Sequence, residues 1–350
     1  MKRFGSALCQ LAYWQDGDLR IVNFLTGKTF SANPRTLEVI HFFRTPQTIR
    51  DALLAFDSYS PDSVGDAILR LIETEHLLEL ESPQWRRDRL LESWQPWLPG
   101  GAFHFLTKDA TYFGGDWTDE QKIQALPRTR PPPQFKKIEG AKTIRLSLPA
   151  RRNDSFFDTL YARRTHRSFS TADLPLEQVE ELLHATWGVQ KYLDGKFFGK
   201  LPGKTSPSGG SRHPIEVYLV ALRVTGLRPG VYHYRADDHC LEKTPAAAGA
   251  HIARQYCADQ PYVAEAAALF IMTAVFARNM WKYRHARGYR VVLLDAGHLG
   301  QTFCLTATRL GLAPFSLAAL NDSLIERDLG IDGITESVLY VVGVGVPAGN

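Results

Sequence analysis

The sequence predicts an α+β protein of two domains, and three observations support this. Residues 6–31 contain short strand-like runs with turn residues between them, and residues 34–77 show the three- and four-residue spacing of helices. From residue 153 onward, helical stretches are interleaved with strand-like runs. With 350 residues, 44% of them hydrophobic, the chain can bury the cores of one domain of ordinary size and one small domain.

The small domain is expected over residues 1–82 and begins with a strand meander. Its strand-like runs are ALCQLAYW, LRIVNF and KTFSA, with turn residues at Asp16-Gly17 and Gly27. Helical patterns follow at residues 34–44, 47–56 and 60–77. A meander followed by three helices looks like a winged-helix-type module, similar to the peptide-recognition domains of ribosomal-peptide modification enzymes. A plain packing domain without a ligand is the alternative.

A tryptophan-containing segment and a linker are expected over residues 83–152. From Pro127 to Arg152 the chain has eight Lys or Arg residues against one Glu, with three consecutive prolines, which predicts an extended strap. The second domain then spans residues 153–350. Its expected helices cover residues 155–164, 176–193, 249–260, 264–268 and 291–310, and its expected strands cover residues 215–224, 231–235, 269–276 and 337–346.

Composition and charge exclude several classes of protein. The net charge is only +4 and the basic residues form no long run, which argues against a nucleic-acid partner. The four cysteines form no CxxC pair, so we expect a reduced, cytoplasmic setting and no structural metal. The first 14 residues are too short and too interrupted for a signal peptide. No run approaches the roughly 18 apolar residues of a membrane span.

A cluster of three arginines and a threonine directly follows a helical pattern, in the segment ARRTHRSF (162–169). The residues are Arg163, Arg164, Thr165 and Arg167. Guanidinium groups bind phosphate oxygens in a bidentate manner, and a hydroxyl donates one more bond, so a phosphate site is one interpretation. The other is that the arginines neutralise the C-terminal end of their own helix.

Glycines and other small residues occur at two further places. The turn Pro207-Ser208-Gly209-Gly210 precedes an alternating apolar strand, so no side chain would obstruct a flat ligand there, although an ordinary loop explains it too. In the helix at 291–310, small residues recur every three or four positions, at Ala296, Gly300, Cys304 and Ala307. Such a thin face permits close helix packing or the approach of a flat ring.

The dipeptide Lys282-Tyr283 places a cation beside a phenol, just before the glycine-containing helix. Neither side chain alone is an effective base near neutrality, but an adjacent pair can stabilise charge mutually and handle a proton. The alternative is a solvated lysine beside a tyrosine that only packs.

These segments, together with the closing VLYVVGVG, resemble in order and spacing the SagB-type dehydrogenases, which are FMN-dependent azoline oxidases of the nitroreductase superfamily. The resemblance covers roughly residues 84–350. It implies a nitroreductase-like FMN-binding domain with a central, mainly antiparallel sheet flanked by helices. It also implies catalysis by Lys282 and Tyr283. The implied FMN contacts are Arg163, Arg164, Thr165, Arg167, Pro207, Ser208, Gly210, Gly297 and Gln301.

The chain departs from the family pattern at three positions. Relatives usually show Glu-Ala-Gly-His-x-x-Gln-Asn where this chain has Asp295 and Thr302 at the first and last positions, which leaves the polar contacts near Gln301 open. Val346 stands where a basic residue often helps to bind the phosphate, so the phosphate would depend more on the arginine cluster.

The implied reaction is oxidation of a peptide-borne thiazoline or oxazoline, or of a related Cα–Cβ bond, with O2 reoxidising the flavin. The implied partners are a peptide or carrier-bound substrate, a cyclodehydratase, and a second copy of the chain in a homodimer. Two alternatives remain open: an NAD(P)H-dependent nitro or quinone reductase on the same fold, and a flavin-free scaffold of a cyclodehydratase complex. The small domain is expected to capture substrate, with a leader peptide adding to the edge of the strand at 28–32.

Overall fold

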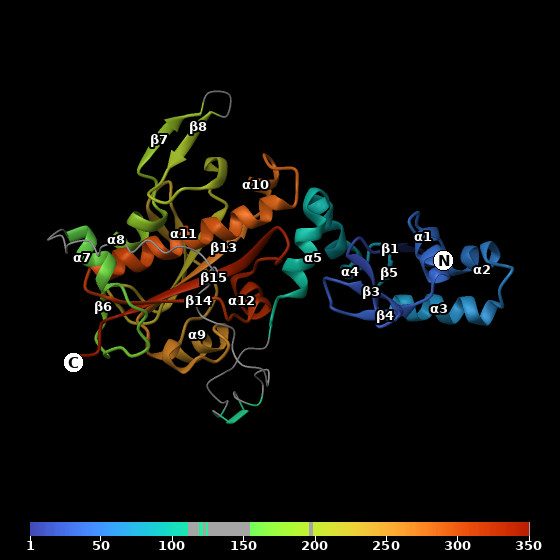
Figure 1. Ribbon diagram of the computed structural model, residues 1–350, viewed down its shortest axis with the longest axis horizontal. Helices are drawn as coiled ribbons and strands as arrows, with labels where there is room; N and C mark the ends of the chain where they lie inside the picture. Colours follow the sequence, from blue (N-terminus) through green and yellow to red (C-terminus); the bar gives the residue numbers. More distant parts are fainter. Residues whose placement is uncertain (111–117, 119, 122–123, 125–154, 196–198, 350) are drawn as a thin grey trace, which may run out of the picture.

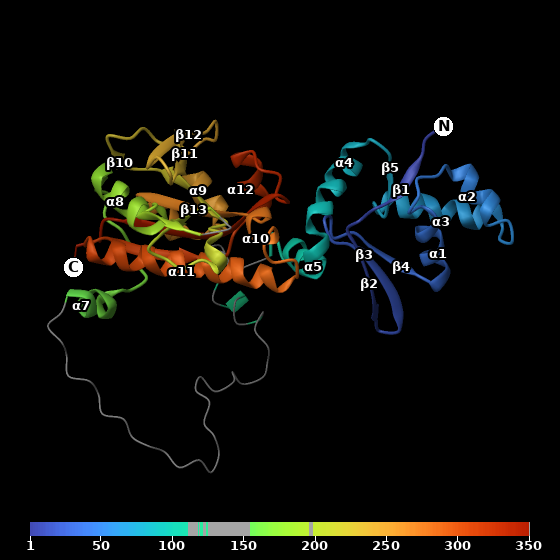
Figure 2. The same ribbon diagram turned by 90° about the horizontal axis from the view of Figure 1, so that it is seen from above.

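The computed structural model describes residues 1–110, 118, 120–121, 124, 155–195 and 199–349 (Figure 1). The proline-rich strap expected at 127–152 lies outside the described residues. A small N-terminal unit and a larger α+β body lie at opposite ends of the molecule, and a helical segment connects them (Figures 1 and 2). No helix in the described part of the chain has both the length and the apolar character needed to cross a membrane.

The N-terminal unit contains the predicted meander and the three predicted helices. The meander is an antiparallel sheet in the order β2-β3-β4, built from β2 (Gln10–Gln15), β3 (Asp18–Asn23) and β4 (Thr29–Ala32). The helices are α1 (Pro34–Phe42), α2 (Ile49–Ala55) and α3 (Pro61–Glu73). One strand pair was not predicted, β1 (Phe4–Ser6) with β5 (Leu77–Glu79). It ends the third helix earlier than expected, because the chain turns back at Glu75, whose φ is +58°.

A helical segment fixes this unit to the body of the protein. It consists of α4 (Pro83–Arg89), the 3₁₀ helix η1 (Leu90–Trp97) and α5 (Leu98–Leu106). On the N-terminal side, the backbone N–H groups of Leu8 and Cys9 donate to the buried carboxylate of Asp88. On the other side, the indole N–H of the fully buried Trp94 donates to the carbonyl of Ile334 at 2.9 Å. The segment therefore contacts both parts through buried polar bonds.

The body is built on a six-stranded sheet in the order β12-β11-β9-β13-β15-β14, and every neighbouring pair in it is antiparallel. The prediction of a central, mainly antiparallel sheet is therefore confirmed. Its strands are β9 (Ile215–Ala221), β11 (Gly230–Arg235), β12 (Cys240–Lys243), β13 (Ala268–Val275), β14 (Ala313–Leu317) and β15 (Glu336–Gly345).

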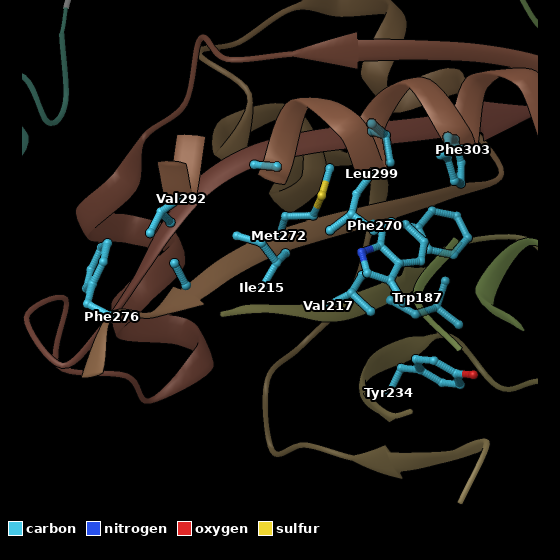
Figure 3. Close-up of a cluster of buried hydrophobic side chains, with 14 of the residues drawn as sticks. Trp187, Ile215, Val217, Tyr234, Phe270, Met272, Phe276, Val292, Leu299 and Phe303 are labelled. Atoms are coloured by element: carbon cyan, nitrogen blue, oxygen red, sulfur yellow. The ribbon is translucent and has the colours of Figure 1, made fainter. Parts of the chain in front are cut away.

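Helices cover both faces of this sheet, as expected. The central strand β13 sends Phe270 and Met272 to one face and Leu269 and Ile271 to the other, following the two-residue period of a strand. The first face packs against α8 (Leu176–Trp187) and α11 (Arg287–Arg309), where Trp187 stacks on Phe270 (Figure 3). The second face packs against α9 (Ala250–Tyr256), the 3₁₀ helix η4 (Pro261–Glu265) and α12 (Asp322–Leu329).

Two predicted helices in this domain were wrong in extent or type. The helix expected over 176–193 ends at Trp187, because the chain turns extended at Gly188, and residues 191–194 form β7. That strand pairs with β8 (Lys200–Gly203) in a hairpin. The stretch 264–268 is no α-helix: its first two residues end the 3₁₀ helix η4, and its last residue begins the buried strand β13. The strand expected over 215–224 ends at Ala221 and is followed by the short β10 (Val224–Thr225), which pairs with β6 (Leu174–Pro175).

Candidate active site

The glycine-containing turn leads into β9 through the short 3₁₀ helix η3 (Gly209–Ser211). Gly210 has φ +65° and ψ 20°, in the left-handed region that favours glycine. Side chains from two other segments reach this turn. Glycine is favoured at position 210 because of this backbone conformation. The turn also contacts residues that are distant in the sequence.

The turn is held against α11 by the buried carboxylate of Asp295. The Ser208 hydroxyl donates to Asp295 Oδ2 at 2.6 Å, and the Gly209 N–H donates to Oδ1 at 3.2 Å. Ser208 Oγ in turn accepts from the N–H of His213 at 2.9 Å. Burial raises the pKa of the Asp295 carboxyl, and the bonds from Ser208 and Gly209 oppose that rise. Nearby, the hydroxyls of Ser206 and Thr302 lie 2.6 Å apart.

Two of the departures from the family pattern therefore have a structural role: Asp295 bonds to this turn, and Thr302 bonds to Ser206 directly before it. The hydroxyl of Ser208, expected to contact a flavin, is engaged within the protein as both donor and acceptor. A flavin contact by Ser208 stays a prediction. In this structure the residue organises the turn.

The Lys282-Tyr283 pair lies over the turn. Both residues are half-buried in the loop between α10 (Ala277–Met280) and α11. A methyl carbon placed on Gly210 would lie 2.5 Å from Tyr283 Oη and 2.9 Å from Lys282 Nζ, so both polar atoms converge on this glycine. Lys282 Nζ is 5.7 Å from the centroid of the Tyr283 ring. The structure thus brings together the predicted acid–base pair and the predicted glycine turn.

Trp97 supports the loop that carries this pair. Its indole N–H donates to the carbonyl of Tyr283 at 2.7 Å, and its ring is fully buried. A methyl group on Gly288, in the first turn of α11, would overlap that ring. The sequence placed Trp97 in a tryptophan-containing segment without a role, because nothing in the local pattern indicates a contact with residues so far along the chain.

The arginine cluster lies at the other end of α11. It follows α7 (Ser155–Ala162) and runs beside β14 and the end of β15, since the His166 N–H bonds to the carbonyl of Pro314 and the Ser170 N–H to that of Val346. Arg164 donates to the carbonyls of Tyr161 and Arg163, as the helix-terminus interpretation expects.

Arg163 and Arg167 point to different neighbours. Burial raises the pKa of the Cys304 thiol to about 11, and the charge of Arg163 opposes that rise, which places Arg163 near the second half of α11. The Arg167 guanidinium lies 5.7 Å from the centroid of the Tyr262 ring. Asp295 and Cys304 are separated by about 13 Å along the helix, at about 1.5 Å of rise per residue. A ligand that contacts both Arg163 and the glycine turn must therefore be elongated.

The two faces of α11 have different roles. Ala296, Gly300, Cys304 and Ala307 are buried. A methyl group on Gly300 would come within 2.6 Å of the Tyr340 ring on β15, so close packing on the sheet accounts for these small residues. Gly297 and Gln301 lie on the exposed face, with no atom within 4 Å of a methyl group placed on Gly297. These two predicted cofactor contacts are accessible but lie outside the turn.

Comparison with known proteins gives one family and several relatives. Residues 160–346 match the model of the nitroreductase family. The chain is 31% identical over 189 residues to MJ1384 of Methanocaldococcus jannaschii, which carries the name of a nitroreductase, covering 54% of this chain and 91% of that protein.

Two further relatives are named as processing proteins. The trifolitoxin-processing protein TfxB of Rhizobium leguminosarum bv. trifolii is 25% identical over 320 residues, covering 85% of this chain and 83% of that protein. This share is larger than residues 83–350 alone can supply, so the match reaches into the N-terminal unit. The microcin B17-processing protein McbC of Escherichia coli is 29% identical over 161 residues, covering 44% of this chain and 59% of that protein.

The carboxylate of Asp295 can be tested as the anchor of the turn. We expect Asp295→Ala to speed hydrogen exchange at the Gly209 and His213 amides by about ten- to a hundredfold, since a lost buried bond costs about 1–3 kcal/mol. Exchange measured by mass spectrometry on peptides covering 206–213 reports this. Asp173→Ala, which removes an exposed carboxylate, serves as the control. Unchanged exchange in Asp295→Ala would show that other contacts hold the turn.

The contact between Trp97 and the loop can be tested with a matched pair of variants. Trp97→Phe and Trp94→Phe each remove one buried indole bond, but only the first bond goes to the loop. We expect Trp97→Phe alone to increase tryptic cleavage after Lys282 and Arg284 several-fold. Equal cleavage in both variants would mean that loosening of the tryptophan segment, rather than loss of this bond, releases the loop.

Proposed function

Because the chain belongs to the nitroreductase family of flavin-dependent oxidoreductases, we propose that it is an FMN-dependent dehydrogenase of natural-product biosynthesis. Its substrate is a peptide-borne thiazoline or oxazoline, or a similar Cα–Cβ bond, which it oxidises to the aromatic azole. The observation that carries this proposal is the convergence of Lys282 Nζ and Tyr283 Oη on Gly210. The names of TfxB and McbC, which process trifolitoxin and microcin B17, support the biosynthetic role.

The residues present fit an FMN molecule that lies along the exposed face of α11. The open space beside Gly297 leaves room for a flat ring. Bound FMN would supply the hydride acceptor, with O2 as the final oxidant. Pro207, Ser208, Gly210, Gly297 and Gln301 would hold its ring system, and Arg163, Arg164, Thr165 and Arg167 its phosphate. Guanidinium groups suit the phosphate because their paired N–H donors match its oxygens.

The chain's own contribution to the chemistry is proton removal. Dehydrogenation of an azoline takes a proton from Cα as well as a hydride, and the proton needs a base placed close to the ring. Tyr283 Oη is the proposed acceptor, and the ammonium of Lys282 stabilises the negative charge that the phenol carries when it acts as a base. Trp97 holds the Tyr283 backbone and thereby positions the acceptor.

A second copy of the chain is the proposed cover of the exposed α11 face. Leu293 and Leu294 are 40% and 55% exposed there, next to Gly297 and Gln301. Enzymes of the superfamily that the sequence resembles are usually dimers with FMN at the subunit interface. In a two-fold dimer the same face serves both copies, so each would complete the other's cofactor site. A cyclodehydratase partner is proposed on the same grounds of resemblance.

The N-terminal unit is proposed to capture the leader part of the substrate peptide. Strand β4 is at the edge of its sheet, with β3 as its only neighbour among the described strands. The Asn23 N–H donates to the carbonyl of Lys28, so in the antiparallel register the N–H groups of Thr29 and Ser31 point away from β3. A peptide could add there as one more strand.

Two variants can show that proton removal and cofactor binding depend on different residues. Lys282→Ala and Tyr283→Phe should keep the visible absorbance of bound FMN yet lose azoline oxidation by at least about a hundredfold, since the first removes the stabilising charge and the second the proton acceptor. Lys243→Ala and Tyr13→Phe, on exposed strands, serve as controls. Protein that shows no flavin band after reconstitution with FMN would refute the proposal. Rapid bleaching by NADPH with turnover of a nitroaromatic would indicate the reductase alternative instead.

Leader capture by β4 can be tested at one residue. Ser31→Pro removes the outward N–H, whereas Ser31→Ala keeps it, and both lose the hydroxyl that accepts from Arg20. We expect only the proline variant to raise KM for a full-length peptide, by about tenfold, while KM for a small azoline mimic stays the same in both. If the proline variant leaves peptide KM unchanged, recognition lies elsewhere.

A further inference from the structure

A cavity of about 590 Å³ lies beside the glycine turn, and the proton-handling chemistry proposed above does not use it. It is open to solvent and is bordered by the β7–β8 hairpin and by strands β9 and β11, with Trp187, Ile215 and Val217 among its apolar lining residues. Lys204 and His213 line both this cavity and a smaller one that also touches Ser208 and Asp295. The large cavity therefore borders the same turn on which Lys282 and Tyr283 converge.

The acidic groups of this cavity are already paired. Every carboxylate among its described lining residues has a basic partner on its own wall. The pairs are Glu216 with Arg278 and with His233 Nε2, Glu242 with His233 Nδ1 and with Arg235, and Asp237 with Arg235. The bonds to both carboxylates raise the pKa of His233, which adds positive charge to this wall as the pH falls. None of these three acids forms an ion pair with Lys204, which also lines the cavity.

Lys204 is the lysine among the lining residues of this cavity. Its side chain is half-buried, and among the described residues its ammonium makes no hydrogen bond or ion pair. Burial lowers the pKa of Lys204, the charge of Glu216 opposes that shift, and Arg278 adds to it. The Arg212 guanidinium, which also lines the cavity, lies 5.3 Å from the centroid of the Trp281 ring, next to the catalytic pair. Lys204 and Arg212 thus place two cations in the lining of this cavity, and within the described part of the chain no ion pair joins Lys204 to a carboxylate.

We propose that Lys204 binds a carboxylate of the substrate peptide, seated in this cavity beside the reacting ring. This inference rests on the proposed function, because it names a feature of that enzyme's substrate. The cavity is large enough for a short peptide segment, and its apolar residues suit the side chains flanking a ring. A carboxylate would give the ammonium a charge-assisted bond and so offset the cost of its burial.

The test compares two thiazoline peptides that differ only in one charge. One peptide carries an acidic residue next to the thiazoline ring, and the other carries the corresponding amide residue. The pair is made twice, once with this residue before the ring and once with it after the ring. Binding is measured by calorimetry without oxygen on flavin-loaded protein that dithionite has already reduced, so that the flavin cannot accept a hydride from the peptide. We expect the acidic peptide of at least one version to bind about tenfold more tightly, the gain of roughly one charge-assisted bond.

Two variants identify the group responsible. Lys204→Met should reduce the affinity for the acidic peptide to that of the amide and leave the amide unaffected. Lys200→Met, an exposed lysine on the same hairpin, should leave the difference intact. The preference should also fade as the pH rises through the lowered pKa of Lys204, since deprotonation removes the charge.

The outcomes separate this inference from the proposed function. Equal affinities for acid and amide in both versions, or a preference that survives in Lys204→Met, would overturn the carboxylate site. Retained preference without turnover of either peptide in air would support the binding site and refute the proposed reaction.

Discussion

The buried carboxylate of Asp295 is the constraint on which the rest of the site depends. A carboxylate is costly to bury unless hydrogen bonds replace its lost water, and the Ser208 hydroxyl and the Gly209 N–H do so here. Because both donors belong to the glycine turn, satisfying the carboxylate also fixes the turn on α11. This arrangement fixes the position of Gly210, on which Lys282 and Tyr283 converge.

Helix α11 joins the parts of the site that are far apart in the chain. Its inner face packs on the sheet through Val292, Leu299 and Phe303 (Figure 3). Gly300 also lies close to the sheet, so the helix cannot shift without disturbing the core. Its first turn meets Trp97, its middle holds the glycine turn, and its second half lies near Arg163. A rigid helix packed in this way sets the spacing between the loop of Lys282 and Tyr283 and the arginine cluster.

The sequence was informative where the signal is local and periodic. The alternation of β9 and β13, the long helix α11 and the N-terminal meander were all predicted, whereas helix ends failed where a single residue decides, as at Gly188. The Lys282-Tyr283 pair and the turn were identified by residue type. Their mutual contact, and the roles of Asp295 and Trp97, depend on side chains that meet only after folding. No local pattern contains that information.

The overlap between the Trp97 ring and the space above Gly288 has an evolutionary consequence. Any side chain at position 288 needs volume that the indole now fills, so a lineage that gains one there must also shrink residue 97. Each change alone is unfavourable, one by collision and the other by leaving a void. Among descendants of this chain, the tryptophan segment and the start of α11 should therefore vary together, although they are encoded far apart.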